Sequence, residues 1–159
     1  MVSLDDGKGR RWPEKEGIFY VREHPALGKI RGLDPWAVEN GMHLIRAERD
    51  CAEGIMMIDD SNRQQYGTVH GGILVAFADT IGGHSLAAHG KMCVTQGSTV
   101  DFLRPAAGEY LLCRATPVKV GKNICVVSVE QRNDAGALVT TALFTFAVVK
   151  ETEPIIVPP

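Results

Sequence analysis

The chain has 159 residues, which is the size of one ordinary domain and leaves little room for a second core. Apolar residues make up 45% of it and charged residues 23%, a composition that excludes collagen-like and generally disordered proteins. The net charge of −2 excludes the basic footprint of a nucleic-acid-binding protein and the cationic patch of a protein that binds anionic membranes. We therefore expect neither a nucleic acid nor a membrane as a partner.

The first 41 residues read as an N-terminal arm with one short helix. Residues 1–17 are charged and interrupted by glycines, and they lack the apolar core of a signal peptide. Asp34 followed by Pro35 is typical of a helix start, so a short helix is expected at 35–39. The four cysteines form no Cys-x-x-Cys pair, which together with the missing leader favours the reducing cytoplasm.

Residues 42–150 read as one α+β domain, in which an antiparallel sheet wraps a single long helix, and residues 151–159 read as a tail. The breaks between the later strands are short and turn-like, which indicates antiparallel neighbours. In the strand at 124–132, Cys125, Val127 and Val129 alternate with polar residues, so one face should be buried. The strands are expected at 42–48, 54–58, 92–103, 109–120, 124–132 and 137–149, and the long helix at 71–88.

The long helix is apolar enough to suggest a membrane span, but we interpret it as a helix buried inside the domain. Asp79 lies at its middle, four glycines dilute its apolar content, and no aromatic belt or basic flank follows it. A helix that is apolar on nearly every side can be covered by a sheet instead of by lipid.

The helix starts with the sequence His70-Gly71-Gly72, which is unusual because glycine costs a helix about 1 kcal/mol relative to alanine. A glycine pair suggests a backbone that a ligand approaches closely. The unpaired N–H groups of a first helical turn, with the positive end of the dipole, form a donor site for an oxyanion or a polarised carbonyl. The alternative is an ordinary tight turn between loop and helix.

Asp79 is the second unusual feature, because it stands alone among apolar neighbours. A carboxylate in an apolar helix must be paired, hydrogen-bonded or protonated, and such residues are often functional. The alternatives are a helix that turns Asp79 to the surface, or a structural hydrogen bond to a neighbouring strand. No Lys or Arg lies within a turn of Asp79, so a local salt bridge is not available.

Gly71 and Asp79 are eight residues apart, which is about 12 Å along a helix. A single carbonyl cannot be polarised by one and attacked by the other, because both must lie within about 3 Å of adjacent atoms. Either the two features are unrelated, or the acid in each site belongs to a second copy of the chain. Two such helices, antiparallel across a two-fold axis, would bring each helix start to the middle of its partner, which predicts an obligate dimer with two shared sites.

The segments Tyr66-Gly-Thr-Val-His-Gly-Gly, Ala-Phe-Ala-Asp-Thr and Asp101-Phe-Leu-Arg-Pro-Ala resemble the hotdog-fold acyl-CoA thioesterases of the phenylacetate-pathway type. The resemblance covers roughly residues 42–149. It implies a long helix wrapped by an antiparallel sheet, paired into dimers and often into dimers of dimers. It also implies hydrolysis of acyl-CoA to a free acid and CoA, with no cofactor.

The resemblance assigns roles by position. Asp79 matches the catalytic carboxylate, as a nucleophile or as a general base for water, and Gly71 matches the backbone N–H that polarises the carbonyl. Gln64 matches an Asn or Gln that orients the attack or the leaving thiolate. Where some relatives carry a hydroxyl residue one turn after the acid this chain has none, so Thr95 or Thr80 would position the water.

The remaining candidates line the substrate. Arg104 and Lys122 lie at strand ends, where they could bind the phosphates of CoA. The alternative is that both are ordinary solvated residues of the surface. His70 and Gly72 are expected to border the site. The five histidines show no metal-ligand spacing, so no metal is expected.

Two other functions remain open, a non-catalytic acyl-CoA sensor and a hotdog-fold dehydratase or hydratase. The acyl-group preference is not readable from the sequence.

Overall fold

The computed structural model describes residues 35–158, so the expected arm, apart from its last residues, lies outside the described part. The described elements follow the order expected from the sequence, with the short helix at the expected residues and the long helix ending one residue earlier. They are α2 (Pro35–Glu39), β1 (Met42–Ala47), β2 (Ala52–Met57), α3 (Gly71–Ala87), β3 (Lys91–Phe102), β4 (Tyr110–Val120), β5 (Ile124–Asn133) and β6 (Leu138–Glu151).

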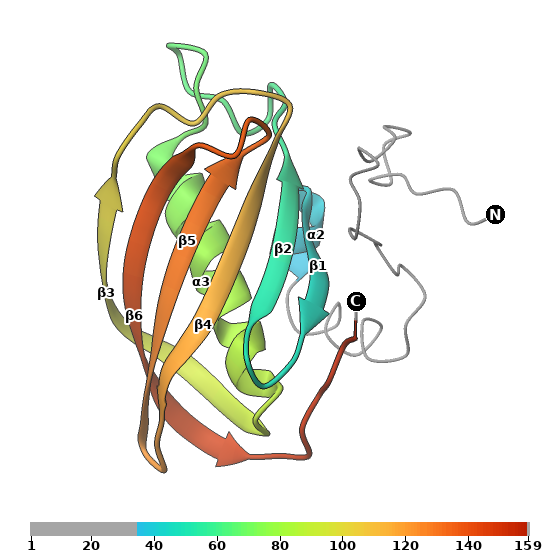
Figure 1. The fold of residues 1–159 in the computed structure, drawn as a ribbon, viewed down its shortest axis with the longest axis vertical. Helices are drawn as coiled ribbons and strands as arrows, with labels where there is room; N and C mark the ends of the chain where they lie inside the picture. The colour runs from blue at the N-terminus through green and yellow to red at the C-terminus, as the bar shows by residue number, and fades with distance from the viewer. Residues whose placement is uncertain (1–34, 159) are drawn as a thin grey trace, which may run out of the picture.

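The strands form one antiparallel sheet in the order β1-β2-β4-β5-β6-β3. Figure 1 shows α3 lying across one face of the curved sheet, with β1 and β3 at the two edges. This is the α+β architecture that the sequence predicts, and it confirms the hotdog fold. In β5, Cys125, Val127 and Val129 are buried against the helix side, as their alternation indicates.

The helix packs closely on the sheet because glycine leaves room at the contact. A Cβ atom added to Gly54 on β2 would collide with the side chain of Ile81 on α3 and would lie 3.0 Å from the carbonyl oxygen of His43. Ile81 is itself fully buried and has no space to retreat. The absence of a side chain at Gly54 therefore sets the distance between helix and sheet.

We expect Gly54→Ala to lower the free energy of unfolding by about 1–3 kcal/mol, because the added methyl group overpacks a filled core. Gly83→Ala is the matched control, since nothing lies within 4 Å of a Cβ at Gly83 and alanine favours a helix. Chemical denaturation of both variants measures the difference. A Gly54→Ala protein as stable as the wild type would contradict this account of the packing.

A buried amide ties the first turns of α3 to the sheet. Gln131 on β5 is fully buried, and its Nε2 donates to the carbonyl oxygen of Leu74 at 2.8 Å. Its Oε1 accepts a hydrogen bond from Thr140 on β6 at 2.6 Å. Because both ends of the amide are satisfied, this polar group is tolerated in the core and fixes where the helix begins.

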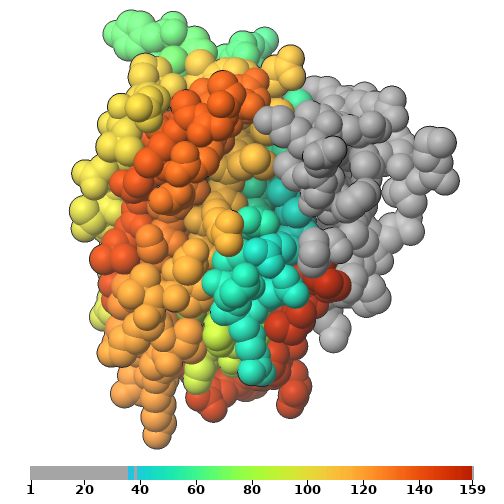
Figure 2. All heavy atoms as spheres, in the orientation of Figure 1, coloured from blue at the N-terminus to red at the C-terminus, as the bar shows by residue number. Residues whose placement is uncertain are grey.

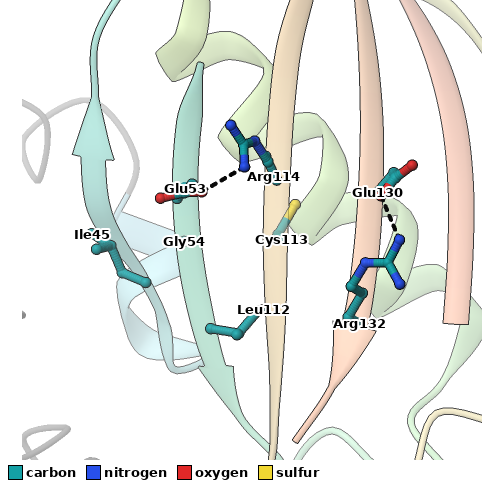
Figure 3. A pocket seen from close by; sticks show the side chains of 8 residues that line it. All are labelled: Ile45, Glu53, Gly54, Leu112, Cys113, Arg114, Glu130 and Arg132. Atoms are coloured by element: carbon teal, nitrogen blue, oxygen red, sulfur yellow. Dashed lines mark hydrogen bonds and ion pairs between the residues drawn. The ribbon is translucent and has the colours of Figure 1, made fainter. Parts of the chain in front are cut away.

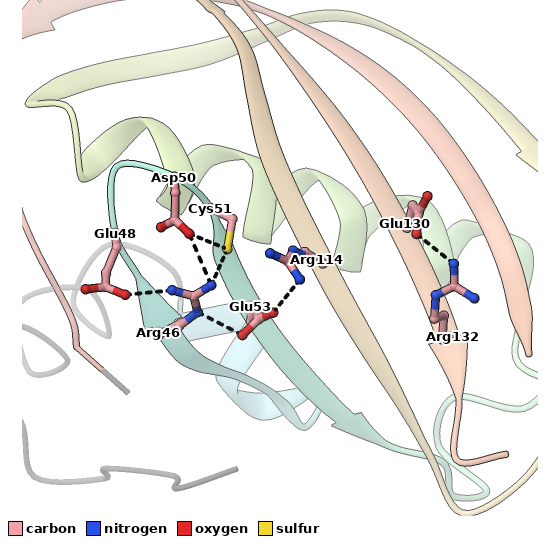
Figure 4. A network of polar contacts seen from close by, with 8 residues as sticks. All are labelled: Arg46, Glu48, Asp50, Cys51, Glu53, Arg114, Glu130 and Arg132. Carbon is pink, nitrogen blue, oxygen red and sulfur yellow. Dashed lines mark hydrogen bonds and ion pairs between the residues drawn. The ribbon is translucent and has the colours of Figure 1, made fainter. Parts of the chain in front are cut away.

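Arg46 forms a network of polar contacts that stabilises the β1–β2 hairpin (Figure 4). Its guanidinium contacts Glu48 at 2.6 Å, Glu53 at 2.9 Å and the sulfur of Cys51 at 2.7 Å. Burial acts to lower the pKa of Arg46, but the hydrogen bonds to Glu53 and Glu48 outweigh it and raise the pKa. The Arg46 guanidinium therefore stays charged, and its contacts stabilise the hairpin.

Candidate active site

The start of α3 presents one backbone donor. His70 is the N-cap, and its Nδ1 accepts a hydrogen bond from the Gly72 N–H at 3.0 Å. The N–H groups of Ile73 and Leu74 donate to the carbonyl oxygen of His70. Within residues 35–158 no acceptor is found for the N–H of Gly71. The cap therefore uses up the neighbouring amides and leaves Gly71 as the donor that a ligand can reach.

Gln64 lies beside this donor, in the loop before α3. Its Nε2 donates to Thr68 Oγ1 at 2.8 Å, and its Oε1 accepts from the Tyr66 N–H at 2.6 Å. These two bonds fix the orientation of the amide and leave its second N–H for a ligand. A hollow of about 490 Å³ brings the predicted residues together, lined by Gln64, Gln65, Tyr66, His70 and Gly71.

Asp79 lies two turns further along α3 and is half-buried. The hydroxyl of Thr95 on β3 donates to Asp79 Oδ1 at 2.6 Å. Thr95 stands at a β-bulge, since the register of β3 against β6 shifts between Thr95 and Gly97. Bulges next to functional sites commonly redirect a side chain. The structure thus brings Asp79 and Thr95 together. Their hydrogen bond joins Asp79 to a neighbouring strand, which the sequence leaves open as one alternative for this acid.

Gly71 and Asp79 do not form a site within one chain, because both lie on α3 eight residues apart. Both border β3, however. Asp79 lies against Thr95, and the ring of Phe102 lies 3.6 Å from where a Cβ on Gly71 would stand. The two halves of the predicted site therefore lie beside the same edge strand, at two levels along it.

The two predicted phosphate-binding cations lie far apart. Arg104 is exposed just after β3, where its guanidinium donates to the carbonyl oxygen of Leu138. Lys122 is exposed in the β4–β5 turn, near Glu151, whose pKa is lowered by its hydrogen bond with Lys91 and by the charge of Lys122. Leu138 is the first residue of β6 and Glu151 is the last, so the two cations lie at opposite ends of this 14-residue strand, roughly 45 Å apart. In Figure 2 the β4–β5 hairpin (orange) reaches one end of the molecule, and the loop before α3 (green) lies at the other. Within one chain the two cations cannot hold the same phosphate.

The other predicted residues border the helix start and its middle. Gly72 is exposed beside its cap, and Thr80, next to Asp79, is half-buried. The sequence alone does not predict two of the contacts that shape the site. Thr68 orients Gln64, and the ring of His70 acts as the helix cap. Thr68 lies four residues after Gln64 in a turn that Gly67 makes with a φ of 84°, a spacing that could have indicated the contact, whereas His is not a typical cap residue.

A separate hollow of about 420 Å³ lies on the outer face of the sheet (Figure 3). Its charged groups already pair with each other, Arg114 with Glu53 at 3.5 Å and Arg132 with Glu130 at 2.9 Å. Cys113 borders it, but burial raises the pKa of this thiol, so a thiolate nucleophile is disfavoured there. None of the predicted site residues lines this hollow.

Two kinds of feature are absent from residues 35–158. No helix there has the length and apolar character needed to span a membrane. No group of three or more His, Cys, Asp or Glu side chains between residues 35 and 158 could hold a metal ion.

Comparisons with known proteins agree with the fold. A model of the thioesterase superfamily matches residues 66–140. A Haemophilus influenzae protein described as a candidate esterase is 34% identical over 116 residues, which are 69% of this chain and 81% of that protein. The structure of the Escherichia coli PaaI protein has a TM-score of 0.74 at 25% identity and covers 80% of this chain and 93% of its own. A Streptococcus mutans protein solved with acetyl-CoA bound has a TM-score of 0.68 at 25% identity, covering 70% and 91%. The chain belongs to the thioesterase superfamily and is an enzyme of the thioester-hydrolase class.

Proposed function

We propose that the protein hydrolyses acyl-CoA thioesters to a free acid and CoA, at two sites shared between two copies of the chain. Each site combines Gly71 and Gln64 of one copy with Asp79 of the other. The observation that carries this proposal is the placement of Gly71 and Asp79 on one helix, about 12 Å apart, beside the same edge strand.

The edge strand β3 offers the surface for the second copy. It is 12 residues long and pairs on one side only, with β6. Met92, Val94 and Phe102 on it are each more than half exposed. A long edge strand with apolar side chains invites a partner strand, and pairing with the β3 of a second copy would continue the sheet.

The positions of the half-sites along β3 set the register of that pairing. Asp79 lies level with Thr95, and Gly71 lies near Phe102. Antiparallel pairing that sets Thr95 near Phe102 of the second copy brings each Asp79 toward the Gly71 of its partner. The two-fold axis then passes beside Ser98 or Thr99, halfway between these levels.

The chemistry follows from the groups brought together. The thioester carbonyl accepts hydrogen bonds from the Gly71 N–H and the Gln64 amide, which stabilise the negative charge that develops on its oxygen. Asp79 of the other copy attacks the carbonyl carbon or removes a proton from the attacking water, while Thr95 holds its carboxylate. The C–S bond breaks, the thiolate of CoA leaves and takes a proton, and water supplies the oxygen of the acid. No cofactor is needed.

The same dimer accounts for the separated cations. Antiparallel pairing of β3 carries the end of the second copy that holds Lys122 toward Arg104 of the first. The two cations could then meet the phosphates of one CoA molecule. Acyl-CoA as the substrate is supported by the E. coli PaaI protein, which is named an acyl-coenzyme A thioesterase and is 28% identical over 136 residues, and by the S. mutans structure with acetyl-CoA.

Two measurements test the proposal. Thiol release from a panel of acyl-CoAs separates an enzyme from a sensor, which would bind without turnover. For the dimer, Ser98→Cys and Thr99→Cys, made in a Cys93→Ser background, are expected to form an intermolecular disulfide at one of the two positions, because that residue faces its own counterpart. Asp101→Cys is the matched control and should not cross-link. A monomeric mass, or cross-linking strongest at Asp101→Cys, would overturn the arrangement.

A further inference from the structure

A second hollow adjoins the start of α3. It has a volume of about 450 Å³, within the range of about 300–1,000 Å³ common for ligand pockets. It shares His70 with the hollow around Gln64, so the two hollows meet at the turn that carries the Gly71 N–H. Its lining comes from α2, the loop after β2 and α3, and consists of Trp36, Ser61, Asn62, Arg63, His70, Gly72, Ile73 and Ala76.

Most polar groups that line this second hollow are hydrogen-bonded within the protein. The Asn62 side chain donates to the carbonyl oxygen of Met57 at 2.7 Å and accepts from the Asp59 N–H at 3.0 Å. The Ser61 hydroxyl donates to the Asp59 carboxylate. His70 Nδ1 holds the Gly72 N–H at 3.0 Å, and Arg63 lies 3.7 Å from Asp60. An apolar group that entered this hollow would break none of these hydrogen bonds.

The remaining lining is apolar. Trp36 is 47% exposed, although an indole gains by leaving water, and Ile73 and Ala76 on α3 are half-buried beside it. The hollow around Gln64 has no aliphatic side chain in its lining, which consists of Gln64, Gln65, Tyr66, His70 and Gly71. The two sides of the Gly71 donor therefore differ, and the side that carries Trp36, Ile73 and Ala76 is the more apolar of the two.

We propose that the second hollow receives the acyl tail of the substrate, that the hollow around Gln64 takes the amide-bearing pantetheine arm, and that Trp36 selects for apolar tails of several carbons or an aryl ring. This inference rests on the proposed acyl-CoA hydrolysis and gives it a substrate class. Trp36 contacts the tail and not the reacting atoms, so it sets specificity and takes no part in the bond changes.

Tail length and Trp36 are tested together by kinetics. In the wild type, kcat/KM should rise from acetyl-CoA to octanoyl-CoA by up to about fourfold per added methylene, which corresponds to about 0.8 kcal/mol per buried CH₂. Trp36→Ala should lose at least about tenfold on octanoyl-CoA and phenylacetyl-CoA and less than about twofold on acetyl-CoA. Trp36→Phe, which keeps an aromatic wall, should recover most of the loss. An equal loss on all substrates, or no loss on any, would overturn the proposal.

Binding without turnover gives a second readout. The chain has two tryptophans, so in a Trp12→Phe variant the fluorescence reports Trp36 alone. S-octyl-CoA, a thioether that cannot be hydrolysed, should shift the emission to the blue because the indole loses water, and S-methyl-CoA should not. Equal shifts with both thioethers, or none, would place the tail elsewhere. If the wild type releases no thiol from any acyl-CoA, the proposed function fails, and the fluorescence result still decides whether this hollow takes the tail.

Discussion

Asp79→Asn is expected to lower kcat for acyl-CoA hydrolysis at least about hundredfold, because an amide can neither attack the carbonyl nor take a proton from water. The fold should survive, since the amide oxygen of Asn can still accept the hydrogen bond that Thr95 donates at 2.6 Å. Thiol release gives kcat, and thermal unfolding checks the fold.

Thr95 supplies the control for this acid. Thr95→Val removes the donor and should cost less than Asp79→Asn, whereas Thr95→Ser keeps a hydroxyl and should recover most of the rate. If Asp79→Asn keeps more than about a tenth of kcat, a loss below about 1.4 kcal/mol, the assignment of the catalytic carboxylate is wrong.

Gly71→Pro is the second large effect we expect, with a loss of about 10²–10³ in kcat, the range seen when one donor to an oxyanion is removed. Proline deletes the N–H and is otherwise suited to this position. Gly71 is the first residue of α3, and His70 before it has φ −63° and ψ 133°, which proline permits. Gly71→Ala keeps the N–H, and its Cβ would be in ordinary contact with Phe102 at 3.6 Å, so its activity should stay close to wild type.

The two inactive variants also test whether the site is shared. When Asp79→Asn and Gly71→Pro chains are unfolded together and refolded in equal amounts, half of the dimers should contain one of each. In such a dimer one of the two sites combines an intact Gly71 with an intact Asp79, so about a quarter of the wild-type activity should return. If mixing restores nothing although mixed dimers form, the site is not shared between the two copies in the proposed way.

Much of the fold is readable from the sequence because its signals are local. Turn residues separate the strands, the sequence Asp34-Pro35 predicts where α2 begins, and the alternation at Cys125, Val127 and Val129 gives the buried face of β5. The distance between Gly71 and Asp79 can also be predicted from the sequence, because eight residues of an α-helix span about 12 Å.

The contacts that complete the candidate site were not readable in the same way. The pairing of β3 with β6, far apart in the chain, makes β3 an edge strand and aims Thr95 at Asp79. Such non-local pairings leave no periodic trace in the sequence, because they depend on which surfaces fit together after the elements form.

The buried link from Gln131 to the Leu74 carbonyl has a consequence for how the Gly71 amide would act. The ends of helices ordinarily fray, and a frayed tip would have to reorder each time it met an oxyanion. Here the buried side-chain amide of Gln131 donates a hydrogen bond to α3 one turn after Gly71, and the ring of His70 caps the start of the helix. The dipole at this tip is therefore stiff before any ligand arrives, and no reorganisation is required of it as charge develops.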